Sequence, residues 1–94
     1  MREVSTKELL QFIFRFAIDN AAQVSGSHWE NLEAFLKRKV EELEADGGTI
    51  VSRVAIDHAH SAITLIHNSV SPEMDEKEAE RAIREVAARF EVQF

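Results

Sequence analysis

Side chains that can hold ions recur along one segment of the chain at the spacing of a helical face. Between positions 53 and 67 this face carries a carboxylate, imidazoles, a guanidinium and hydroxyls. A carboxylate with imidazoles suits zinc or another divalent ion, whereas arginine with protonated histidine suits an anion. The candidate ligand-binding residues on this face are therefore Arg53, Asp57, His60, Thr64 and His67. His58, on the apolar arc of the same segment, is a further candidate.

Distance argues against a metal ion held by this face alone. His60 and His67 would lie two helical turns apart, about 10 Å, which is too far for one shared ion. The segment also lacks the His-Glu-x-x-His and Glu-x-x-His patterns of helical metal sites. We therefore predict no metal and no cofactor, and we expect a solvated polar face. The alternative is an oligomer whose His-lined groove, with Arg53, sequesters a small anionic ligand or a metal.

Two polar residues fall inside apolar arcs. His58 lies near the centre of one such arc and Asn20 near the centre of another. A buried polar group must find a partner or it destabilises the fold by about 1–3 kcal/mol. We therefore favour a neutral, buried His58 bonded to Asn20 or to a backbone carbonyl, over a His58 that acts as a base or touches a ligand. Ser61 lies beside His60 and Asp57 on one helix, which does not build a triad, so we predict no catalytic residues and no enzyme.

Four helices are predicted to position these residues, over about 5–24, 28–46, 49–70 and 72–90. The first two predicted helices each begin with the spacing of a capping box. The residues are Ser5 with Glu8 in the first and Ser27 with Glu30 in the second. Pro72 suits the first position of the last helix. The loops are short and we detect no internal repeat, so consecutive helices should pack antiparallel. The prediction is one all-α, four-helix-bundle-like domain over residues 1–94.

An α+β fold with a hairpin within residues 49–67 is the alternative. Thr49–Ile56 and Ala62–Ile66 are rich in β-branched residues, which favour strands. However, the polar positions from Ser52 to Asn68 repeat with a period of 3.6. The stretch between the two runs also lacks the glycine, asparagine or proline of a tight turn. The pattern therefore favours a helix.

The first and third predicted helices are apolar over most of their circumference and should lie at the centre of the domain. A four-helix monomer hides about half of such a helix, which leaves an exposed patch of several hundred Å², typical of an interface. We therefore predict a homo-oligomer that associates through the first helix. The predicted interface residues are Phe12, Phe14, Phe16 and Ile18.

Composition limits the classes of partner. The 94 residues carry a net charge of −6, which disfavours binding to nucleic-acid phosphates. The chain has no cysteine, shows no secretion signal and no run long enough to span a membrane, so we expect no membrane association and a cytoplasmic location. The C-terminal end of the second predicted helix carries an acidic cluster suited to docking a basic partner: Glu41, Glu42, Glu44 and Asp46.

These observations favour a small, non-enzymatic regulatory or inhibitory protein that binds a macromolecular partner. The absence of a catalytic pattern, the apolar surplus and the acidic cluster all point to an interaction surface. The oligomeric ligand-sequestering protein described above is the competing hypothesis.

Overall fold

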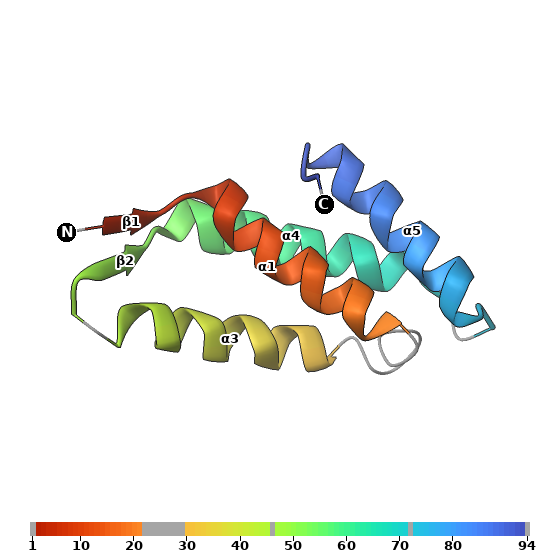
Figure 1. Cartoon of the computed structure of the whole chain (residues 1–94), viewed down its shortest axis with the longest axis horizontal. Coiled ribbons are helices and arrows are strands. Elements are labelled where there is room, and N and C mark those ends of the chain that lie inside the picture. Colours follow the sequence, from red (N-terminus) through yellow and green to blue (C-terminus); the bar gives the residue numbers. More distant parts are fainter. Residues whose placement is uncertain (1, 22–29, 46, 72, 94) are drawn as a thin grey trace.

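The computed structural model describes residues 2–21, 30–45, 47–71 and 73–93. These ranges form a mostly helical single domain, with four helices and one small sheet, that measures 44 × 23 × 18 Å (Figure 1). The elements follow in the order β1 (Arg2–Val4), α1 (Thr6–Asp19), α3 (Glu30–Glu44), β2 (Thr49–Val51), α4 (Arg53–Ser69) and α5 (Glu76–Arg89).

Side-chain caps start the helices for which a cap is described. The Ser5 hydroxyl accepts the backbone N–H of Glu8 at 3.1 Å, which confirms the predicted cap of α1. The other half of that capping box does not form, because the Glu8 carboxylate pairs with Arg2 of β1 instead. The predicted second capping box at Ser27 lies outside the described residues. The last helix starts later than predicted, because the Asp75 carboxylate accepts the N–H of Glu78 at 2.8 Å and caps α5 there.

A two-stranded parallel sheet is the part of the fold that the sequence prediction missed. Val4 pairs with Val51 and Arg2 with Thr49. The predicted helix start at residue 49 is therefore wrong, because this stretch is β2 and α4 begins only after its Ser52 cap. The hairpin alternative is also wrong, since Arg53–Ser69 is a single helix.

The described elements form two similar units, each with a strand followed by two helices. Val4 and Val51 are matched in the register, and the serine that follows each of them caps the next helix. The separation in sequence between Val4 and Val51 also separates buried residues of α3 from buried residues of α5. These pairs are Leu32 with Ala79 and Leu36 with Ile83. From the sequence alone we detect no internal repeat.

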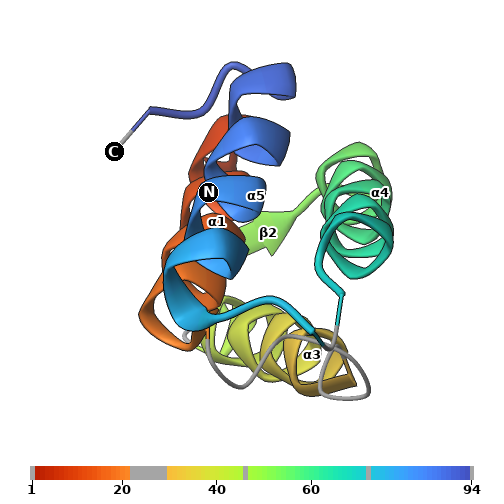
Figure 2. The same cartoon turned by 90° about the vertical axis from the view of Figure 1, so that its right-hand side faces the viewer.

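The pair α1 and α4 forms the centre of the domain, as predicted. Their mutual contact is the most extensive between any two described helices, and α3 and α5 each pack against both (Figures 1 and 2). Consecutive helices run in opposite directions in Figure 1. Three buried alanines, Ala55, Ala59 and Ala62, line the inner face of α4. Their small side chains let α1 approach closely.

The surplus aromatic residues of α1 are largely covered by this chain. Phe14 is fully buried, and its ring centroid lies 5.9 Å from that of Phe90. Phe16 is half-buried and stacks on Phe35 of α3, with the two ring centroids 4.1 Å apart. The Lys39 ammonium lies 4.6 Å from the centroid of the Phe12 ring. Assigning Phe14 to an interface surface was therefore wrong, because it belongs to the core. Self-association is no longer needed to cover this helix.

The two polar residues expected in apolar arcs lie elsewhere. His58 is exposed because it does not belong to the buried face of α4. That face includes Ala55, Ala59 and Ile63. The predicted arc was too broad, since it included Val54, which is 61% exposed. Asn20 is half-buried at the C-terminal cap of α1, where its side-chain amide donates to the Phe16 carbonyl at 2.9 Å.

Candidate functional site

A groove with a volume of about 540 Å³ lies between α3 and α4. Its α3 wall consists of Glu33, Ala34, Leu36, Lys37, Val40 and Glu41. Its α4 wall consists of Ile56 and His60. The groove forms because α3 is less closely packed against α4 than α1 and α5 are.

Apolar residues floor the groove and charged residues rim it. Leu36 is buried, whereas Val40 and Ile56 are only half-buried and keep part of their surface open. Lys37, Glu41 and His60 are exposed. An apolar floor inside a polar rim is the arrangement found in binding sites, where burial gives affinity and the rim selects the partner.

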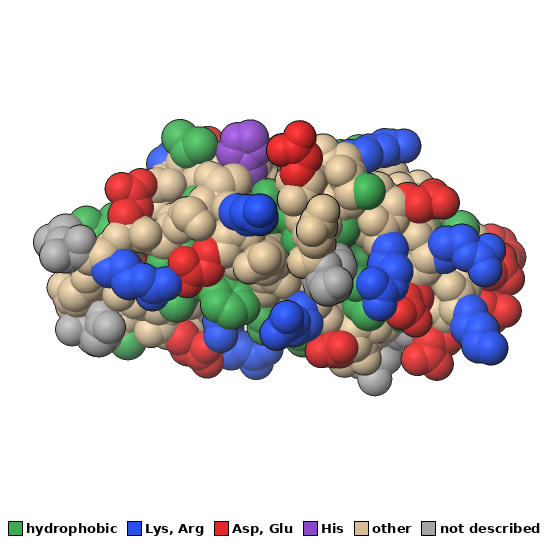
Figure 3. All heavy atoms as spheres, turned by 45° about the horizontal axis from the view of Figure 1, so that its top comes forward, with side chains coloured by type: hydrophobic (Ala, Val, Ile, Leu, Met, Phe, Trp, Pro, Cys, Tyr) green, Lys and Arg blue, Asp and Glu red, His purple; other side chains and the backbone are tan. Residues whose placement is uncertain are grey.

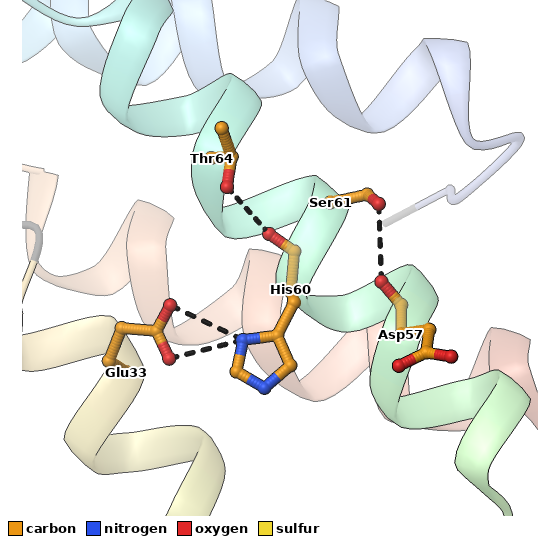
Figure 4. A network of polar contacts seen from close by, with 5 residues as sticks. All are labelled: Glu33, Asp57, His60, Ser61 and Thr64. Atoms are coloured by element: carbon orange, nitrogen blue, oxygen red, sulfur yellow. Dashed lines mark hydrogen bonds and ion pairs between the residues drawn. The ribbon is translucent and has the colours of Figure 1, made fainter.

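One pair of side chains joins the two walls. His60 of α4 points toward Glu33 of α3, and its Nδ1 lies 3.3 Å from Oε1 and 3.2 Å from Oε2 of that carboxylate (Figure 4). Both side chains are partly exposed, so the pair contributes modestly to stability, as surface ion pairs do. It links α3 to α4 at one end of the groove.

The remaining candidates on α4 do not join this site. Arg53 pairs with Asp57 at 3.5 Å on the exposed side of the helix. Thr64 donates its hydroxyl to the His60 carbonyl at 3.0 Å, and Ser61 donates to the Asp57 carbonyl at 3.2 Å (Figure 4).

The three candidate histidines and Asp57 are therefore not assembled into one pocket of this chain. His58 is exposed, His67 is half-buried, and neither lines the α3–α4 groove, where His60 is the one histidine present. The His-lined groove of an oligomer stays a prediction. Within the described ranges no three metal-ligating side chains come together.

The acidic cluster contributes one residue to the groove. Glu41 lines it, while Glu42 pairs with Lys39 at 3.7 Å and Glu44 is exposed at the end of α3. Asp46 lies outside the described residues. The predicted docking cluster is thus split between the groove and the free surface.

Other hollows lie outside the α3–α4 groove. One of about 540 Å³ is lined by Lys7, Ala88, Glu91, Val92 and Gln93, of which only Ala88 and Val92 are apolar. On the face of the molecule drawn in Figure 3, acidic and basic side chains are interspersed, and apolar side chains show only in separate areas. A smaller hollow of about 180 Å³ lies between α1 and α5, lined by Arg15, Ile18, Asp19 and Arg84. Its mixed charges and single apolar residue make it a weaker binding site than the α3–α4 groove.

Sequence reasoning missed most of the groove. Glu33, Ala34, Lys37 and Val40 were not among the predicted site residues. A signal was present, because Glu33, Lys37 and Glu41 are spaced four apart beside the apolar stripe of the same helix. That spacing places them in one row but does not show which helix lies opposite.

No protein-family model, curated protein or solved structure matches this chain. None of the helices in the described ranges has the length and apolar character needed to cross a bilayer. Function must therefore be inferred from the groove.

Proposed function

We propose that this protein is a small, non-enzymatic interaction protein that binds a segment of a partner protein in the α3–α4 groove. The observation that carries the proposal is the partly open apolar floor of Leu36, Val40 and Ile56 between charged walls. A regulatory or inhibitory role follows if binding covers a functional segment of the partner.

The dimensions of the groove support a helical segment as its occupant. The α3 wall runs from Glu33 to Glu41, a rise of about 12 Å, or slightly more than two helical turns. Amphipathic helices bind apolar grooves by inserting side chains at intervals of three and four residues. Two turns accommodate two or three such side chains.

Ala34 offers a direct test because it is exposed and lines the groove. Ala34→Arg places a long side chain in the groove without removing any core contact. Ala88→Arg is the comparison variant, since Ala88 is another exposed helical alanine on α5; it lies outside the α3–α4 groove and lines the second hollow of about 540 Å³, so the pair of variants tells the two hollows apart. Both variants should unfold within about 0.5 kcal/mol of the parent protein, as surface substitutions usually do.

The experiment is affinity capture from cells that express the protein, with the parent and both variants compared quantitatively. We expect a partner that is retained by the parent and by Ala88→Arg but lost by Ala34→Arg. If every captured protein is retained equally by Ala34→Arg, the groove is not the interaction site and the proposal fails.

A further inference from the structure

The rim of the groove carries a row of alternating charges. Glu33, Lys37 and Glu41 follow one another at intervals of four residues and all line the groove. Residues four apart on a helix lie on one face, about 6 Å from each other. A segment lying along α3 therefore meets a negative, a positive and a negative charge in succession.

Two of these charges have no ionic partner within the chain as described. Lys37 and Glu41 form no ion pair with any side chain in the described ranges, although neighbouring Lys39 pairs with Glu42. Glu33 is held by His60 through one imidazole nitrogen. A cation from a partner can take the place of this partly exposed imidazole, so the whole row is open to recognition.

From this row we infer the partner's chemistry, on the basis of the function proposed above. The occupant is an amphipathic helix that presents a basic, an acidic and a basic residue at intervals of four, beside apolar residues that contact Val40 and Ile56. Matching three charges selects partner and register, whereas the apolar contacts supply most of the affinity.

Alternating signs argue against other classes of occupant. A nucleic acid or an anionic membrane presents charges of one sign and would be repelled by Glu33 and Glu41. A purely basic peptide would meet Lys37 at the middle of the row. Only an occupant with its own alternating charges satisfies all three positions.

The probe is a display library of stabilised single-helix peptides in which three charged positions and the adjoining apolar positions vary. The library is selected against the full chain and counter-selected against Ala34→Arg. We expect the enriched peptides to carry the basic–acidic–basic row and to bind about tenfold more tightly than versions with all three charges reversed, because each exposed pair contributes modestly. The preference should weaken at 1 M salt, where screening is strong.

The triple variant Glu33→Lys, Lys37→Glu, Glu41→Lys reverses the row and is the decisive comparison. It should prefer the charge-reversed peptides, and circular dichroism checks that it remains folded. Enriched peptides without a preferred charge order, or a failure to select any peptide that Ala34→Arg rejects, would overturn this inference. An apolar small molecule whose binding Ala34→Arg abolishes, with no peptide selected, would do the same. The proposed function is judged separately, by groove-dependent capture of a cellular partner.

Discussion

Glu91 lies just beyond the end of α5 in a backbone conformation that glycine adopts much more readily. Its φ is 59°, in the left-handed region. Its N–H donates to the Ala88 carbonyl at 3.1 Å, and the N–H of Val92 donates to the Ala87 carbonyl at 3.0 Å. These two bonds form a Schellman motif, in which glycine is the usual residue at this position. Val92 is buried, so the turn also closes the core.

Glu91→Gly should therefore raise the free energy of unfolding. A side chain costs about 1–2 kcal/mol in the left-handed conformation, and the extra freedom that glycine gives the unfolded chain offsets about 0.4–1 kcal/mol of this. Removing a carboxylate from the C-terminal end of a helix adds about 0.3 kcal/mol. The expected net gain is about 0.3–1.9 kcal/mol, or roughly 1–15 °C in melting temperature for a domain of this size.

Thermal unfolding followed by circular dichroism provides the measurement, with Glu91→Ala as the control. Alanine removes the same carboxylate but keeps the Cβ atom, so it should show only the small electrostatic gain. If Glu91→Gly melts at or below the temperature of Glu91→Ala, backbone strain at this position is not the cause and the reasoning is refuted.

Three further predictions concern the core, a cap and the link across the groove. Phe14→Ala should lower the free energy of unfolding in urea by about 3–5 kcal/mol, because it empties a fully buried site; a loss below 1 kcal/mol would place Phe14 outside the core. Ser52→Ala should cost about 1 kcal/mol in the same assay, since it removes the cap of α4, whereas Ser61→Ala within the helix should be nearly neutral. A double-mutant cycle on Glu33→Gln and His60→Gln should give a coupling free energy of about 0.2–1 kcal/mol, and a zero coupling at every pH from 5 to 8 would show that the two walls are not linked.

Local patterns in the sequence determined the helices and the identity of the central pair. The apolar breadth of α1 and α4 predicted that they would lie innermost, and Ser5 predicted the start of α1. These predictions succeed because a cap and a helical stripe depend on residues within a few positions of each other. His58 was predicted in the core but lies on the surface, because a modest shift in the centre of an apolar arc moves a residue from one to the other.

Contacts between distant segments were decided only by the tertiary structure. The strands around Val4 and Val51 are three residues long, which is too short for an alternating pattern to be recognised, and each strand is paired only through the other. The groove depends in the same way on where α3 lies relative to α4. Glu33 and His60 are far apart in the chain. The pattern within each helix predicts the face on which the residue lies, but not the residue that it contacts on the other helix. That choice is made by the packing of the whole core, because the buried side chains of all four helices together set the distance between the two walls.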